Sequence, residues 1–173
     1  MAILLDKHGI HATLERLADE IVSSIPSGCP VGVIGIRRRG DDLAKRLLRM
    51  LEDRAVTDVA YGSVDITLYR DDLAEIGPSA IVRTTEIDFD VGGRYIVLVD
   101  DVIHTGRSVR SALSAIIDLG RPKAIRLAVL VDRGGRELPI QPEFVGLRGK
   151  DEDEHITVLL EESDGADRVE VRT

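Results

Sequence analysis

Apolar residues along the chain follow one period typical of helices and another typical of buried strands. Apolar positions three and four residues apart predict three amphipathic helices, at roughly residues 11–25, 41–51 and 107–119. Short runs rich in valine and isoleucine predict strands, at residues 31–36, 59–69, 95–99 and 125–131. Because strands and helices alternate, we predict an α/β fold with a single doubly wound, largely parallel sheet and flanking helices.

The rest of the chain predicts connecting segments and a small terminal hairpin. Residues 70–83 are charged, contain a Gly-Pro pair and have no apolar period, which is typical of a mobile loop. Apolar alternation at residues 156–160 and 169–171 predicts a hairpin that turns at an Asp-Gly pair. The chain has 173 residues without repeats or linkers, so residues 1–173 are expected to form a single domain.

The clearest chemical signal follows the strand predicted at residues 95–99. Asp100 and Asp101 stand where that strand is expected to end, and a loop rich in glycine and hydroxyl groups, residues 105–108, opens the next helix. Open α/β sheets bind ligands at the carboxyl ends of their strands. The free amides and the dipole of a helix N-terminus favour a phosphate, whereas a carboxylate pair accepts hydrogen bonds from a polyol. Together these features indicate a sugar phosphate.

Other interpretations of these residues make different demands. A solvated pair of acids that caps the following helix would require no ligand. A phospho-accepting receiver domain needs its acids after the first strand and a lysine at a late strand end, which is not the order found here. The loop also lacks the lysine of a nucleoside-triphosphate loop and the glycine spacing of a dinucleotide loop.

A second loop of this kind precedes the second predicted helix. Residues 35–40, GIRRRG, lie between a strand and a helix and fit either a basic turn or an anion-binding helix N-terminus. Two anion-binding N-termini on neighbouring strand ends suit a ligand with two separate phosphate groups.

The run VLVDDVIHTGRS, residues 97–108, resembles the motif by which type I phosphoribosyltransferases bind 5-phosphoribosyl-1-diphosphate (PRPP). Further segments are similar, in the same order, to one branch of that superfamily, the bifunctional pyrimidine operon attenuation protein/uracil phosphoribosyltransferases, or PyrR family. These segments are DITLYRDDL at 65–73, LGRP at 119–122, AVLVDRG at 128–134 and RELPI at 136–140. The resemblance covers roughly residues 10–146 and weakens at both ends.

The resemblance implies a type I phosphoribosyltransferase fold with a small hood, a homodimer or larger homo-oligomer, and a reaction in which uracil and PRPP give UMP and diphosphate. Mg²⁺ is implied as a cofactor bound mainly through PRPP. Asp100 and Asp101 would hold the ribose hydroxyls, and Arg70, on a flexible flap, would contact the leaving diphosphate; these are the implied catalytic residues. The other implied substrate-binding residues are Arg38, Arg39, Gly40, Val102, Ile103, His104, Thr105, Gly106, Arg107, Ser108, Asp132 and Arg133.

Several residues depart from the family pattern. His104 stands where the family usually has tyrosine, and it either contacts the base or is a tolerated polar substitution. The positions that match the family's RNA-contacting residues on the first helix hold Glu15, Arg16 and Asp19. Gly135 replaces a histidine, and residues 150–154, KDEDE, replace a basic stretch. Because added carboxylates repel a phosphate backbone, we predict that attenuation-type RNA binding is lost or much weakened.

Composition narrows the remaining classes of function. The chain has 23 basic and 31 acidic residues, a net charge of −8 and only 3% aromatic residues, which is unlike a general DNA- or RNA-binding protein. Cys29 is the single cysteine, which excludes an internal disulfide and favours a cytoplasmic setting. The opening apolar run is broken at Asp6, so neither a signal peptide nor a membrane span is expected. The four histidines show no metal-ligand spacing, so no protein metal centre is expected.

Two further functions fit the same fold. One is an RNA-binding transcription attenuation regulator that senses UMP or UTP, and the other is a ligand-binding domain with little catalysis. Turnover of uracil and PRPP separates the enzyme from the idle domain, and binding to a pyrimidine-operon leader RNA separates the regulator from both.

Overall fold

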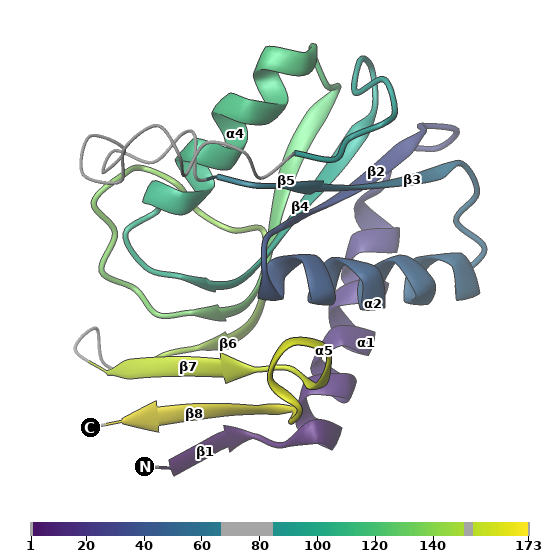
Figure 1. Ribbon diagram of the computed structural model, residues 1–173. Helices are drawn as coiled ribbons and strands as arrows, with labels where there is room; N and C mark the ends of the chain where they lie inside the picture. The colour runs from purple at the N-terminus through teal and green to yellow at the C-terminus, as the bar shows by residue number, and fades with distance from the viewer. Residues whose placement is uncertain (1, 67–84, 151–153, 173) are drawn as a thin grey trace.

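Figure 1 shows a central sheet with helices on both faces and a smaller sheet beside it, in a computed structural model that describes residues 2–66, 85–150 and 154–172. In chain order the elements of these ranges are β1 (Ala2–Leu5), α1 (Lys7–Ser24), β2 (Val31–Ile36), α2 (Arg39–Asp53), β3 (Val59–Val64), β4 (Tyr95–Ile103), α4 (Arg107–Leu119), β5 (Ala124–Asp132), β6 (Phe144–Arg148), β7 (His155–Leu159), α5 (Glu161–Asp164) and β8 (Arg168–Arg172). The central sheet has strand order β3-β2-β4-β5-β6 with every neighbouring pair parallel, and the smaller sheet, order β1-β8-β7, is antiparallel.

Alternation along β4 divides the core into two layers. Tyr95, Val97 and Val99 belong to the buried cluster shared with α1 and α2, whereas Ile96 and Leu98 belong to the cluster shared with α4. Successive side chains of a strand point to opposite faces, so a strand that is buried on both faces is apolar throughout. This explains the continuous apolar runs that predicted the central strands, and the expected doubly wound, parallel α/β sheet is confirmed.

The first helix begins earlier than predicted. α1 starts at Lys7 rather than near residue 11, because the Asp6 carboxylate accepts a hydrogen bond from the Gly9 amide at 2.8 Å and so caps the helix. The first turn has little apolar character, so its start is set by the cap and not by the apolar period.

β4 is longer than predicted, and this changes the setting of the acid pair. The strand continues to Ile103 because its parallel pairing with β5 continues, with Ile103 opposite Asp132. Asp100 and Asp101 therefore lie within the strand and not beyond its end. The strand predicted at residues 59–69 is found only in part, because β3 ends at Val64. Residues 67–69 and the predicted loop at residues 70–83 lie outside the described residues.

The smaller sheet joins the two ends of the described chain. The predicted terminal hairpin is confirmed as β7 and β8, with Ile156 opposite Val171. β1 pairs with β8 and was not predicted, because it has four half-buried or exposed residues and its partner lies at the other end of the sequence. β6, a five-residue strand that pairs with β5 at the sheet edge, was also missed. No helix within the described ranges is long and apolar enough to cross a membrane.

Removing the cap of α1 should lower the stability of the protein. Asp6→Ala leaves the Gly9 amide without its acceptor, and the free energy of unfolding should fall by about 1 kcal/mol, measured by urea denaturation. Asp88→Ala, which removes an exposed acid outside the helices, serves as the control and should change stability by less than about 0.5 kcal/mol. Equal stability of Asp6→Ala and the unaltered protein would contradict the capping role.

Candidate functional site

The predicted loops meet at one edge of the central sheet. β2, β4 and β5 are neighbouring parallel strands, so their carboxyl ends lie together. Residues 37–40 follow β2, residues 104–108 follow β4, and residues 133–137 follow β5. Every predicted site residue except Arg70, which lies outside the described residues, belongs to this edge or to the strand ends beneath it.

The two acids of β4 lie in different environments. Asp100 is buried, with 6% of its surface exposed, and its Oδ1 accepts a hydrogen bond from the Asp101 amide at 2.9 Å. Burial, and then the neighbouring charge of Asp101, raise the pKa of Asp100 well above its usual range. Asp101 is only half-buried. The two carboxylates are therefore not equivalent, and Asp101 is the more accessible of the pair.

The loop after β4 forms a small anion-ready cavity. A cavity of about 90 Å³ is lined by Asp100 and by every residue from 102 to 109. Gly106 adopts a φ of +92° as the N-cap of α4, a conformation that a residue with a side chain rarely adopts. The amides of Gly106 and Ser108 have no hydrogen-bond acceptor in the described part of the chain. These amides are therefore free to bind a phosphate at the helix N-terminus.

Two predicted residues at the end of β4 pack toward the core. Ile103 is 2% exposed and packs in the cluster of α4, and Val102 packs partly against the cluster of α1 and α2. The Ile103 side chain is therefore not available to a ligand, whereas that of Val102 is partly exposed. Arg107 and Ser108, in contrast, are exposed at the mouth of the loop.

The N-terminus of α2 lies directly against the end of β4. A Cβ at Gly40 would lie 2.7 Å from the Val99 carbonyl oxygen and 3.0 Å from the Asp100 Cα, which is too close for any side chain. The peptide bond between Arg37 and Arg38 is cis. The amides of Arg39 and Gly40 have no acceptor among the residues described, so this helix start also offers free N–H groups to an anion.

The three arginines of this loop point to different partners. Arg37 donates to the Ser63 hydroxyl at 3.0 Å and pairs with Glu86 at 3.1 Å, which ties it to β3 and its neighbour. The Arg38 side chain is exposed and makes no hydrogen bond or ion pair with a described residue, while its carbonyl accepts the Asp41 and Asp42 amides. Arg39 donates two hydrogen bonds to Asp164, each 2.9 Å long. Sequence reasoning missed Asp164, because it is 125 residues away along the chain.

The end of β5 forms a network that supports the β4 loop. Asp132 is 6% exposed and accepts hydrogen bonds from the Gly134 amide, from Arg136 at 2.8 Å and from Arg148 at 3.1 Å. Arg136 also donates to the His104 carbonyl at 2.9 Å. The Asp132 carboxylate is thus fully engaged within the protein.

The other residues of this network sit close beside the β4 loop. The Arg133 amide donates to the Ile103 carbonyl at 2.9 Å, and the buried Arg133 Nε has no partner in the described structure. Asp132 and Arg133, predicted as substrate-binding, therefore lie at the site. Arg136, which was outside the predicted set, joins the two loops.

His104 and Gly135, which both differ from the family pattern, lie in contact with each other. A Cβ at Gly135 would lie 2.6 Å from the His104 Nε2 and 2.8 Å from its Cδ2. The imidazole of His104 therefore occupies the space that a side chain at residue 135 would need. Gly135 also has a φ of +69°, which favours glycine.

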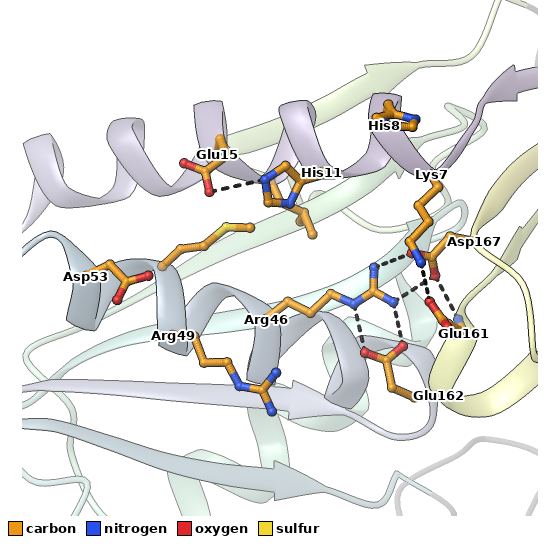
Figure 2. A pocket seen from close by; sticks show the side chains of 12 residues that line it. Lys7, His8, His11, Glu15, Arg46, Arg49, Asp53, Glu161, Glu162 and Asp167 are labelled. Atoms are coloured by element: carbon orange, nitrogen blue, oxygen red, sulfur yellow. Dashed lines mark hydrogen bonds and ion pairs between the residues drawn. The ribbon is translucent and has the colours of Figure 1, made fainter.

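A larger cavity lies elsewhere in the molecule. Its volume is about 520 Å³, and it opens between α1, α2 and the α5 turn (Figure 2). Leu14 and Met50 form its apolar part, and charged side chains of both signs surround it. Because it is away from the carboxyl ends of the parallel strands, it is distinct from the site described above.

Comparisons with known proteins agree on the family. The phosphoribosyl transferase domain family matches residues 2–161. A bifunctional protein PyrR of Pelotomaculum thermopropionicum is 50% identical over 169 residues, covering 97% of this chain and 93% of the relative. A bifunctional protein PyrR of Deinococcus radiodurans is 46% identical over 171 residues, covering 98% and 93%, and one of Thermus aquaticus is 49% identical, covering 98% and 94%.

Solved structures of lower identity share the fold. The hypoxanthine-guanine phosphoribosyltransferase of Bacillus anthracis gives a TM-score of 0.73 at 20% identity, covering 99% of this chain and 98% of that one. The hypoxanthine phosphoribosyltransferase of Trypanosoma cruzi gives 0.72 at 16% identity, covering 99% and 95%. The expected type I phosphoribosyltransferase fold is therefore confirmed.

Adding a methyl group at residue 40 should separate α2 from β4. Gly40→Ala places a Cβ 2.7 Å from a backbone oxygen, so backbone must move, and the free energy of unfolding should fall by about 1–3 kcal/mol in guanidinium denaturation. Gly92→Ala is the matched control, because its Cβ would meet only the flexible Asp90 side chain, and it should lose no more than about 0.5 kcal/mol. Similar stabilities of the two variants would argue against this contact.

Proposed function

The chain belongs to the phosphoribosyl transferase domain family and, within it, to the PyrR proteins, and on this basis we propose that it transfers the 5-phosphoribosyl group of PRPP to uracil, giving UMP and diphosphate. One observation carries the proposal: the acids of β4 lie between two helix N-termini with free amides. PRPP has a phosphate at one end, a diphosphate at the other and ribose hydroxyls between them. The order of groups along the ligand is the order of groups along the site.

In this proposal the 5′-phosphate binds at the N-terminus of α4 and the diphosphate at the N-terminus of α2. The amides of Gly106 and Ser108 donate to the first group, and the amides of Arg39 and Gly40 donate to the second. Asp101 accepts hydrogen bonds from the ribose hydroxyls, since it is the accessible acid of the pair. Asp100, buried against Gly40, holds the two loops together.

The reaction needs no nucleophile from the protein. The bond between ribose C1 and the diphosphate oxygen breaks with both electrons leaving on diphosphate. Uracil N1 bonds to C1, and the N1 proton passes to the departing diphosphate. The Asp101 carboxylate favours positive charge that develops on the ribose, and Arg38 and Arg39 favour the negative charge that develops on the leaving diphosphate. Arg70, placed by the resemblance on a flap over the site, would add a further cation.

Mg²⁺ fits this donor set as an ion held chiefly by substrate oxygens. Among the described residues no group of three or more His, Cys, Asp or Glu is arranged to hold a metal, while Asp101 offers one half-buried carboxylate. Mg²⁺ commonly binds one or two carboxylates together with substrate phosphates, so Asp101 is the protein group that would share it. When bound, the ion would neutralise charge on the diphosphate.

His104 is proposed to lie beside the base. Its ring rests on Gly135 and its carbonyl is fixed by Arg136, so the imidazole is held at the mouth of the β4 loop. Asp132 and Arg133, which follow on β5, are proposed to bound the same space, Asp132 by fixing the loop and Arg133 by its unpaired Nε.

The enzyme assay tests the proposal directly. Purified protein offered uracil, orotate, hypoxanthine and guanine with PRPP and Mg²⁺ should consume PRPP with uracil. Asp101→Asn should lower kcat/KM for PRPP by about 10- to 100-fold, because hydrogen bonds to a charged acceptor contribute roughly 1.5–3 kcal/mol. Glu52→Gln, on the exposed end of α2, should leave kcat/KM unchanged.

Each outcome of this assay has a separate meaning. Consumption of PRPP with a purine and not with uracil would overturn the assigned base. No consumption with any base would overturn the transferase and leave a ligand-binding domain. An unchanged kcat/KM in Asp101→Asn would overturn the ribose role.

We also propose that RNA binding of the attenuation type is lost or weak in this chain, although its relatives are named bifunctional. Glu15 and Asp19 both pair with the same Arg54, at 2.6 and 2.7 Å, so the two carboxylates share one positive charge and this part of α1 keeps a net negative charge. Arg16 donates to the Val145 and Gly146 carbonyls and pairs with Glu20 at 2.6 Å. The one basic residue that matches the family's RNA-contacting set is therefore committed to β6 and its own helix.

A gel shift with a pyrimidine-operon leader hairpin checks this. At physiological salt, with and without UMP, we expect weak binding that falls steeply as salt rises. The double variant Glu15→Gln, Asp19→Asn, which removes two negative charges, should bind no more weakly than the unaltered chain. Tight binding that UMP stimulates would show the proposal to be wrong.

A further inference from the structure

The α5 turn, which connects β7 to β8, is fastened to the first two helices by all four of its side chains. Glu161 pairs with Lys7 at 2.7 Å, and Glu162 pairs with Arg46 at 2.5 Å. Figure 2 shows these pairs, together with Asp167, which also binds Arg46. The other two contacts reach the N-terminal turn of α2, where Ser163 hydrogen-bonds to Asp42 and Asp164 binds Arg39. The small sheet is thus anchored to the helix that begins at the proposed diphosphate site.

The contact between Asp164 and Arg39 has the geometry of a fixed fork. Asp164 Oδ2 accepts from Arg39 Nε and Oδ1 accepts from Nη2, each at 2.9 Å. The same Oδ2 accepts the Leu160 amide at 3.0 Å, so the carboxylate is held by its own turn before it meets the guanidinium. The hydrogen bonds from Arg39 lower the pKa of Asp164 to about 2. The carboxylate is therefore charged at neutral pH.

The Arg39 guanidinium lies near the carboxylate of Asp101 as well as that of Asp164. Its pKa is raised first by Asp164 and also by the negative charge of Asp101, so the guanidinium lies within electrostatic range of that carboxylate. Its side chain is 36% exposed, and that of Asp164 is 18% exposed. A guanidinium has five N–H donors, and the fork with Asp164 uses two of them. The remaining donors are free to bind a second anion.

We propose that Asp164 is a positioning residue that holds Arg39 in the orientation in which it binds the diphosphate of the substrate. The inference rests on the proposed function, because it assigns diphosphate to the N-terminus of α2. Asp164 itself does not touch the substrate. A long side chain that is already ordered loses less conformational entropy when a ligand binds, so the C-terminal turn contributes to affinity through Arg39.

The Asp164 carboxylate could also weaken diphosphate binding, and the two effects change the affinity for diphosphate in opposite directions. A carboxylate next to Arg39 also reduces the net positive charge that diphosphate meets. If that effect dominated, removing the carboxylate would tighten diphosphate binding. The double anchoring of Asp164, to Leu160 and to Arg39, favours positioning, because the carboxylate and the guanidinium form a rigid unit.

Asp164→Asn is the variant of choice, because it keeps the side-chain volume and an acceptor for the Leu160 amide. We expect the Kd of inorganic diphosphate with Mg²⁺, by calorimetry, and the KM for PRPP each to rise about three- to tenfold. The kcat should fall as well, because Arg39 also stabilises the charge that develops on the leaving diphosphate. The Kd of UMP should change by less than twofold, because UMP has no diphosphate for Arg39 to bind. Glu162→Gln, which removes the pair with Arg46 in the same turn, is the matched control and should leave all four values within twofold.

A double-mutant cycle shows whether the effect passes through Arg39. In an Arg39→Ala background, Asp164→Asn should produce no further loss of diphosphate affinity. Tighter binding in Asp164→Asn, equal losses in Asp164→Asn and Glu162→Gln, or full additivity with Arg39→Ala would each overturn the proposal. If the unaltered protein binds neither diphosphate nor PRPP, the proposed function fails. If the unaltered protein binds them and Asp164→Asn binds them equally well, only the role of Asp164 fails.

Discussion

The contact between the N-terminus of α2 and the end of β4 sets the geometry of the whole site. Because residue 40 is glycine, the helix approaches until the space for a Cβ is filled by the Val99 carbonyl and the Asp100 backbone. This approach covers Asp100, raises its pKa and leaves Asp101 as the accessible carboxylate. It also brings the free amides of α2 next to the acids that precede the second anion-binding helix, α4. The absence of a side chain at residue 40 thus brings two helix N-termini with free amides and the half-buried Asp101 carboxylate together at one edge of the sheet.

Two networks outside the ligand site hold its loops in place. Arg136 joins the β4 loop to the β5 loop by binding both the His104 carbonyl and Asp132. On the other side, α5 fastens the start of α2 through Asp164 and Ser163. Both networks use charge-assisted hydrogen bonds, which are stronger than neutral ones. Each network also links distant parts of the chain, Arg136 to the His104 carbonyl and Arg39 to Asp164. The small sheet formed by the two ends of the described chain therefore supports the site as well as covering α1 and α2.

The parts of the fold that sequence predicts are those governed by periodicity. The strands at residues 31–36 and 95–99 and the helix at residues 107–119 follow from burial on one or two faces. β1 and β6 were missed because short edge strands obtain their stability from a partner strand and carry little pattern of their own. The site loops were predicted because glycine-containing segments follow the apolar runs of β2 and β4 and open the next helix. The contacts that hold these loops were not predicted. No sequence pattern around Asp164 or Arg136 indicates that Asp164 binds Arg39 or that Arg136 binds the His104 carbonyl.

The central claim is that a single ligand spans both helix N-termini, with its sugar at Asp101. Calorimetric competition in the presence of Mg²⁺ tests it most directly, with UMP and inorganic diphosphate added to the protein singly, together and against PRPP. If UMP occupies the α4 site and diphosphate the α2 site, the two should bind at the same time, and each should compete with PRPP. Mutual exclusion of UMP and diphosphate, or binding of PRPP alongside either one, would contradict the claim.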